Sequence, residues 1–180
     1  VTFHPVTLEN NSAKVHFQEL LDVIDELEDT NIIITKANSD SGGRVINSMI
    51  DDYLARNYHK SIGFTSLGQL RYLSAMQHVD AVVGNSSSGI IETPSFKIGT
   101  INIGDRQKGR IKADSIIDCL PNKKSIRNAF KILYSKGFQS KLKNTESPYG
   151  SGSASKEIVE VLKTVELNNI IKKSFYNTNH

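Results

Sequence analysis

The stretch AVVGNSSSGIIE, residues 81–92, has the pattern of a short buried strand, a turn of small or polar residues and the start of a helix. Ala81–Val83 is apolar and largely β-branched, which is typical of a strand in a parallel sheet covered on both faces. A turn over Gly84–Gly89 precedes a helix that we expect to begin near Ile90. Such a helix directs unpaired N–H groups and its positive dipole end at the turn, which suits a phosphate group. Glu92 is expected in the first helical turn, facing the same cleft.

A serine-rich turn has a second interpretation. Serine is a favoured N-cap residue, so the three serines at residues 86–88 would then serve only to begin a helix. The stretch matches neither the P-loop nor the GxGxxG dinucleotide pattern. Taken alone, it supports phosphate binding and plain capping equally, and the rest of the chain has to distinguish them.

Strands and helices alternate along the remaining sequence. Apolar strand candidates fall at residues 1–3, 31–35, 59–64, 81–83, 100–103 and 115–118. Amphipathic helices separate most of them, and Ser66 and Ser125 are expected to cap two of these helices. The alternation predicts an α/β fold: a three-layer, Rossmann-like domain with a mostly parallel sheet of about six strands.

Composition restricts the partners and the compartment. The 180 residues carry a net charge of +3, which indicates neither a nucleic-acid partner nor a membrane partner. The single cysteine, Cys119, excludes an internal disulfide and fits a reducing, cytoplasmic compartment. Histidines, acids and the cysteine show no metal-ligand spacing, so neither a metal nor another cofactor is expected. The sequence opens at Val1 in a predicted strand, without Met, and we therefore expect an excised domain.

Five loops follow the predicted strands and hold the chemically unusual residues. They are His4-Pro5, 38–43, Thr65-Ser66, 84–89 and 104–107. The carboxyl ends of parallel strands share one edge of a sheet, where ligands bind in folds of this class. Core packing gives no reason for His, Asp, Ser and Arg to gather there, so the convergence favours a binding site.

Five sequence blocks resemble, in their order, the C-terminal half of a UDP-N-acetylglucosamine 2-epimerase of the hydrolysing branch. The blocks are FHPVT at 3–7, NSDSGG at 38–43, GNSSSG at 84–89 with Glu92, NIGDRQKGR at 102–110 and SPYGSG at 147–152. The resemblance extends from residue 1 to about residue 162. It implies a two-domain, glycosyltransferase-B-like fold in which this chain is the nucleotide-binding half.

The resemblance assigns the UDP part of the substrate to the serine loop and its neighbours. Ser87, Ser88 and the N–H of Gly89 would hold the diphosphate, and Arg106 would pair with it as a planar cation. Glu92 would accept hydrogen bonds from ribose hydroxyls. Without the resemblance, Glu92 is equally well explained as an acid that matches the helix dipole, and Arg106 as a solvated surface residue.

Tyr72 aligns with an aromatic residue that lies against the uracil ring in relatives, and Phe64 would line the same pocket. On its own, Tyr72 would be assigned to the core side of its helix. His4 matches the cleft histidine of the family and is the catalytic candidate, because an imidazole exchanges protons near neutral pH.

Ser86, Arg110 and Asp40 are weaker candidates for substrate binding. Asp40 lies in a loop that the family usually writes Pro-Asn-x-Asp, whereas this chain has Ala37 in place of the proline. A turn-forming aspartate is the simpler explanation of Asp40.

The resemblance implies that the full-length enzyme eliminates UDP from UDP-GlcNAc in the anti sense and adds water to the opposite face, giving N-acetylmannosamine. Most acid and base roles fall on carboxylates of the other half, so this chain alone is expected to bind nucleotide without catalysis. Three alternatives stay open: the same chemistry on UDP-diacetylbacillosamine, a glycosyltransferase-B domain that passes a sugar to an acceptor, and a nucleotide-sugar sensor.

We expect residues 1–165 to form the UDP-binding domain and residues 166–180 a polar tail. The expected partners are the UDP-sugar, the N-terminal domain of the same polypeptide and further copies in a homo-oligomer of the full protein. Neither nucleic acid nor a membrane is expected as a partner.

Overall fold

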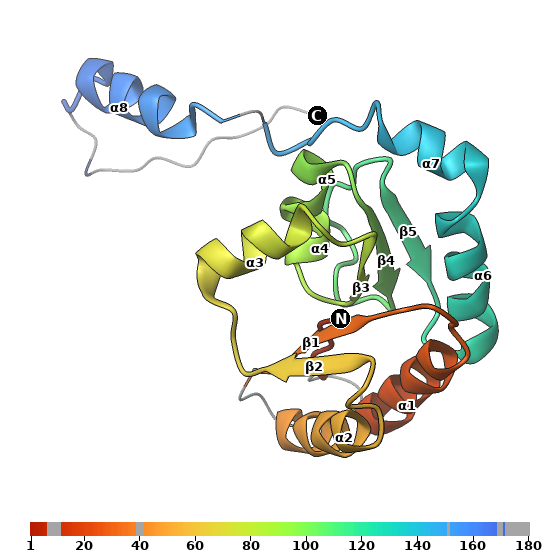
Figure 1. Ribbon diagram of the computed structural model, residues 1–180. Helices are drawn as coiled ribbons and strands as arrows, with labels where there is room; N and C mark the ends of the chain where they lie inside the picture. The colour runs from red at the N-terminus through yellow and green to blue at the C-terminus, as the bar shows by residue number, and fades with distance from the viewer. Residues whose placement is uncertain (7–11, 39–41, 151, 169–170, 172–180) are drawn as a thin grey trace, which may run out of the picture. The chain divides into compact units, whose positions relative to one another are not determined.

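The computed structural model describes residues 1–6, 12–38, 42–150, 152–168 and 171 (Figure 1). The chain divides into two compact units, Val1–Tyr149 and Gly150–His180. The second unit contains α8 (Ala154–Thr164). The boundary at residue 165 stays a prediction.

The first unit is built on parallel strands: β1 (Ile32–Thr35), β2 (Ser61–Phe64), β3 (Ala81–Gly84), β4 (Gly99–Ile103) and β5 (Ile116–Cys119). β1 pairs with β2, and β3, β4 and β5 form a second ladder. Thr2 joins the two ladders through parallel bridges to Thr35 and Gly84. The spatial order is therefore β2–β1–Thr2–β3–β4–β5, and the direction of winding reverses between Thr2 and β3. The predicted α/β fold with a mostly parallel sheet is confirmed.

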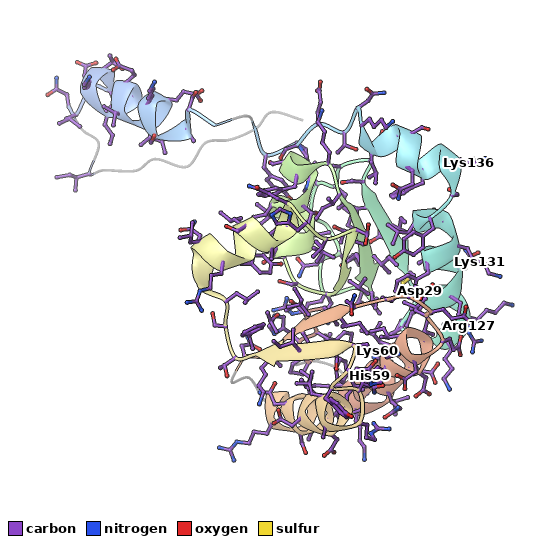
Figure 2. The ribbon with its side chains drawn as sticks, viewed as in Figure 1. Asp29, His59, Lys60, Arg127, Lys131 and Lys136 are labelled. Carbon is purple, nitrogen blue, oxygen red and sulfur yellow. The ribbon has the colours of Figure 1, made fainter. Side chains whose placement is uncertain are left out.

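Helices of the first unit are α1 (Ser12–Asp25), α2 (Gly43–Arg56), α3 (Gly68–Met76), α4 (Ser88–Ile91), α5 (Thr93–Phe96), α6 (Lys123–Leu133) and α7 (Lys136–Leu142). Figure 1 shows α1 and α6 on one side of the sheet and α3 on the other. α1 contacts α2 and α6 and buries an apolar face whose members follow helical spacing: Phe17, Leu20, Leu21 and Ile24. On the outer side of α6, Arg127 and Lys131 point away from the sheet (Figure 2).

Two predicted helix caps are wrong. Asn122 is the N-cap of α6, and its side chain accepts from the N–H of Ser125, whose hydroxyl accepts from the N–H of Leu120 instead. α3 begins after Leu67, without a side-chain cap, because the hydroxyl of Ser66 accepts from Gly68 within the preceding turn. Within the described residues, no helix combines the length and the apolarity needed to cross a bilayer.

Candidate functional site

Asn85 connects the loops at the carboxyl edge of the sheet. It follows β3, is 1% exposed, and donates its main-chain N–H to the carbonyl of Thr2 at 3.1 Å. Its side chain spans the winding reversal: Oδ1 accepts from the N–H of His4 at 2.7 Å, and Nδ2 donates to the carbonyl of His4 at 2.8 Å. This paired contact fixes the main chain of the His4-Pro5 loop against the end of β3.

The carbonyl of Asn85 also holds the loop that follows β4. It accepts from Nη1 of Arg106 at 3.1 Å and from Nε2 of Gln107 at 2.8 Å. Gln107 is 2% exposed, and its Oε1 is buried without a hydrogen-bond partner. Arg106 is exposed and uses one of its donors on Asn85, so the other donors can serve an anion beside the serine loop.

His4 lies between Asn85 and the loop that follows β1. Its Nδ1 is 3.1 Å from Oδ1 of Asn38 and 3.3 Å from the main-chain N of Asn38, so its tautomer decides which of the two contacts is made. Gly42, with a φ of 87°, packs on Pro5, where an added Cβ would lie 3.2 Å from the proline ring. The structure therefore places the described ends of the 38–43 loop beside His4. Asp40 lies outside the described residues.

The serine loop is tightly hydrogen-bonded within itself. The hydroxyl of Ser86 accepts from the N–H of Ser88 at 3.3 Å, and the carbonyl of Ser86 accepts from the N–H of Gly89 at 3.2 Å. Ser87 is the N-cap residue of α4, and its carbonyl accepts from Ile90 and Ile91. The N–H of Gly89 is therefore engaged within the loop, and its service to a diphosphate stays a prediction.

Gly89 has a packing role as well. A Cβ at this position would lie 2.7 Å from the side-chain methyl of Thr100, so the absence of a side chain lets α4 approach β4. Thr93 stabilises this contact between α4 and β4. Its hydroxyl donates to the carbonyl of Gly89 at 2.6 Å and lies 2.7 Å from the hydroxyl of Thr100.

A helix does begin close to the predicted Ile90, but the prediction that Glu92 lies in its first turn is wrong. α4 covers only Ser88–Ile91, Glu92 closes it, and α5 begins at Thr93. Pro94 explains the break, since it has no N–H to continue the hydrogen bonding of α4. A helix this short aligns few peptide dipoles, so hydroxyls and Arg106 have to supply most of the attraction for an anion.

Tyr72, Ser88 and Glu92 form a cluster between α3 and α4. The hydroxyl of Ser88 donates to the phenol oxygen of Tyr72 at 2.7 Å. Burial raises the pKa of Tyr72, the hydrogen bond from Ser88 opposes the rise, and the nearby charge of Glu92 adds to it. Oε2 of Glu92 is buried without a hydrogen-bond partner, although the residue is only half-buried. A carboxylate oxygen in this state suits a ligand that donates hydroxyl protons.

Phe64 and Arg110 complete the set of predicted residues. Phe64 ends β2 at the same edge of the sheet and is half-buried. Arg110 is exposed, and its main-chain N–H donates to the carbonyl of Gln107 at 3.3 Å. The described contacts thus form two groups, one around Asn85 and one around Tyr72, and the serine loop contributes Asn85 to the first and Ser88 to the second.

Sequence reasoning missed Asn85 and Gln107 as site residues. Asn85 had one visible signal, an amide just after an apolar strand, but the partner of its side chain, His4, lies 81 positions away. Within the described part of the chain, no cluster of three or more His, Cys, Asp or Glu side chains is arranged to hold a metal ion. The chemistry that the site offers is hydroxyls and a guanidinium for an anion, and one buried carboxylate oxygen for hydroxyl donors.

Comparison with known proteins identifies the family. A family model described as UDP-N-acetylglucosamine 2-epimerase matches residues 1–163. The GDP/UDP-N,N'-diacetylbacillosamine 2-epimerase (hydrolyzing) of Campylobacter jejuni is 43% identical over 176 residues, covering 97% of this chain and 45% of that protein. The UDP-N,N'-diacetylbacillosamine 2-epimerase (hydrolyzing) of Legionella pneumophila is 33% identical over 179 residues, covering 94% and 43%.

A crystal structure of the UDP-GlcNAc 2-epimerase from Neisseria meningitidis bound to UDP-GlcNAc superposes with a TM-score of 0.74 over 91% of this chain and 44% of that chain. At 18% identity this likeness shows the fold. The chain therefore spans about 45% of the length of the curated relatives it matches.

Proposed function

The chain belongs to the UDP-N-acetylglucosamine 2-epimerase family, and on that premise we propose that it is the nucleotide-binding half of a hydrolysing UDP-sugar 2-epimerase. The observation that carries the proposal is the meeting of the serine loop, Arg106 and His4 through Asn85 at one edge of the sheet. The other half of the active site would come from the rest of a longer polypeptide, and a homo-oligomer of that polypeptide remains part of the proposal.

The sugar is proposed to be N,N'-diacetylbacillosamine, with N-acetylglucosamine as the second candidate. Two relatives that match nearly the whole chain are named as diacetylbacillosamine 2-epimerases. The sequence alone had made UDP-GlcNAc the first candidate and UDP-diacetylbacillosamine the alternative. The single cysteine is the support for a cytoplasmic location.

The diphosphate would be held by the hydroxyls of Ser86 and Ser87 together with Arg106, and by the hydroxyl of Ser88 only after it releases Tyr72. As the bond between sugar C1 and the phosphate oxygen breaks, negative charge grows on the departing UDP. The guanidinium of Arg106 would stabilise that charge, and the carbonyl of Asn85 holds it in place before the reaction begins. Gly89 would contribute its N–H only after a rearrangement of the loop, and Arg110 would be a second cation for the diphosphate.

The nucleoside would lie along the Tyr72 group. The unpartnered oxygen of Glu92 would accept from the ribose hydroxyls, and Tyr72 with Phe64 would cover the uracil ring. His4 would donate to the diphosphate or exchange a proton with the sugar. Asp40 would help to position the sugar.

The proposed reaction is an elimination followed by an addition. A base removes the proton from sugar C2, its electron pair forms the C1–C2 double bond, and the C1–O electrons leave with UDP. Water then adds across the double bond from the opposite face, which inverts C2. The base belongs to the other half of the full enzyme, so this chain should bind UDP without turnover.

Calorimetry tests the proposal on the chain itself. UDP should bind more tightly than uridine, and Arg106→Ala should weaken UDP binding roughly 10- to 100-fold, because it removes a charge-assisted hydrogen bond. Uridine binding should not change, and Lys131→Ala, on the outer side of α6, should leave both affinities unchanged. Equal affinity for UDP and uridine would rule out a phosphate role for the serine loop and Arg106.

A second measurement distinguishes the proposed epimerase from a glycosyltransferase of the same fold. A polypeptide of the relatives' length should release UDP from its UDP-sugar in the absence of an acceptor. Release only when an acceptor is added would instead identify a transferase.

A further inference from the structure

Two asparagine side chains hold the two main-chain segments that meet at the His4 ring. Asn85 binds both the N–H and the carbonyl of His4. Asn47 of α2 binds Ala37 in the same way: its Oδ1 accepts from the N–H of Ala37 at 2.8 Å, and its Nδ2 donates to the carbonyl of Ala37 at 3.2 Å. The contact between the His4 ring and Asn38 therefore lies between two segments whose main chains are both held by side-chain amides.

The start of α2 lies close to the segment that carries Asn38. A Cβ at Gly43, the first residue of α2, would lie 2.2 Å from the carbonyl oxygen of Asn38, so only a residue without a side chain allows this approach. Ala37 is 8% exposed, and its main-chain groups therefore need partners inside the protein. Asn47 supplies a donor and an acceptor from one side chain, which neither an apolar residue nor an ionised carboxylate could do.

The main-chain N–H of Asn38 restricts the protonation of the His4 ring. Its nitrogen lies 3.3 Å from Nδ1 of His4, and Oδ1 of the same asparagine lies 3.1 Å from that Nδ1. A proton on Nδ1 could be donated to Oδ1, but it would then face the hydrogen of the main-chain N–H. An amide side chain can turn by half a revolution and offer its donor instead, whereas a main-chain N–H can only donate. Both contacts are favourable together when Nδ1 accepts and Nε2 carries the proton.

We propose that Asn47 is a positioning residue: it holds the main chain of Asn38 against Nδ1 of His4 and so makes Nε2 the proton-bearing nitrogen of the neutral imidazole. The inference rests on the proposed function, in which His4 contacts the substrate. A neutral ring in this tautomer donates from Nε2 and has no lone pair there to take up a proton. Of the two roles proposed for His4, it therefore favours donation to an oxygen of the departing diphosphate over proton exchange with the sugar.

Nitrogen-15 NMR of the histidine rings tests the tautomer on the 180-residue chain at about pH 8, where an ordinary histidine is neutral. The resonances of Nδ1 and Nε2 differ strongly between the protonated and unprotonated states, and His4→Gln identifies the His4 signals among those of the five histidines. Relative to the urea-unfolded chain, the ratio of the Nε2–H to the Nδ1–H tautomer should rise at least about fivefold, the effect of one hydrogen bond of ordinary strength. A proton on Nδ1 in the folded chain would overturn the proposal.

Three variants separate the main chain of Asn38 from its side chain. Asn38→Ala keeps the main-chain N–H, so the tautomer ratio of His4 should stay within about twofold of the native ratio. Asn47→Ala releases that main chain and should bring the ratio to within about twofold of the unfolded value. Asp51→Ala is the matched control, because it removes a different tether of the same segment to α2, the 2.6 Å ion pair with Lys36, and should keep the native ratio.

Binding of UDP to the Asn47→Ala variant gives a functional measurement. A ring that is no longer held has to be ordered when the ligand binds, so UDP affinity should fall roughly two- to tenfold while uridine affinity stays unchanged. Unchanged UDP affinity in a variant that has lost the tautomer preference would overturn the proposal.

The remaining outcomes are equally decisive. Loss of the Nε2–H preference in Asn38→Ala or in Asp51→Ala, or its persistence in folded Asn47→Ala, would overturn the proposal. Unfolding of Asn47→Ala would also overturn it, because the whole fold would then depend on Asn47. Equal affinity of the native chain for UDP and uridine would refute the proposed function, whereas a preference for UDP together with a proton on Nδ1 would refute this inference alone.

Discussion

Replacing Asn85 with alanine should test whether Asn85 stabilises the main chain of His4 without acting on its imidazole. The substitution removes two hydrogen bonds to the main chain of His4 and leaves that N–H and carbonyl without these partners. An unpaired buried main-chain group costs about 1–3 kcal/mol, and the pair is partly buried, so the lower half of that range applies to each. The expected loss is about 2–4 kcal/mol, which is roughly 4–16 °C in the melting temperature of a domain of this size.

Urea denaturation followed by far-ultraviolet circular dichroism suits the measurement, because the chain has no tryptophan. Asn128→Ala is the matched control, since Asn128 is exposed on α6 and its replacement should change stability by less than about 0.5 kcal/mol. His4→Ala provides the second arm. The bonds from Asn85 reach only the main chain of His4, so the effects of the two substitutions should add to within about 0.5 kcal/mol.

Two results would refute this reasoning. A loss below about 0.5 kcal/mol for Asn85→Ala would mean that solvent satisfies the His4 main chain as well as the amide does. A coupling energy above about 1 kcal/mol between the two substitutions would mean that Asn85 acts through the imidazole.

Three other predictions concern backbone geometry and titration. Gly84→Ala should cost at least about 3 kcal/mol in urea unfolding, because a Cβ there would lie 1.9 Å from the carbonyl of Thr2 at a φ of 137°; a cost below about 1 kcal/mol would contradict it. Burial raises the pKa of the Cys119 thiol to about 12, so a thiol reagent at about pH 8 should modify the folded chain far more slowly than the urea-unfolded chain, and equal rates would show that the thiol is not shielded. The hydrogen bond from Lys123 holds the pKa of Asp22 below its usual value of 3.8. The ionised carboxylate therefore stabilises the folded chain above pH 3.8, and this stabilisation is lost as the pH falls through the lowered pKa of Asp22 in the folded chain. The difference in urea midpoint between the native chain and Asp22→Asn should shrink accordingly, and a constant difference would exclude the titration.

The parallel fold could be predicted because its signals are local. Each buried strand is a short apolar run, and each helix between strands shows an apolar face, so the alternation is readable without knowledge of contacts. The edge on which the loops meet then follows from parallel pairing alone. The break between α4 and α5 has an equally local signal, since Pro94 stands two residues after Glu92 in the sequence.

The contacts within the site could not be predicted in the same way. Asn85 binds a residue 81 positions away, and Ser88 binds Tyr72 across 16 positions, so neither contact leaves a periodic trace. The engagement of the Gly89 N–H by Ser86 depends on the local turn geometry, which small residues leave open. Residue types at a sheet edge therefore predict what a site can bind, whereas the donors already in use become visible only in the folded chain.

The two ladders contribute different parts of the candidate site. The end of β1 carries Asn38, and the ends of β3 and β4 carry the serine loop and Arg106. Among the described residues, Thr2 bridges both ladders. Asn85, at the end of β3, binds the main chain of His4 in the loop that follows Thr2. A ligand that contacts both His4 and the serine loop therefore requires the two ladders to keep their relative position. The contacts of Thr2 and Asn85 fix that position, so they stabilise the binding geometry as well as the fold. This role fits the burial of Asn85, which has no proposed contact to the substrate and is 1% exposed.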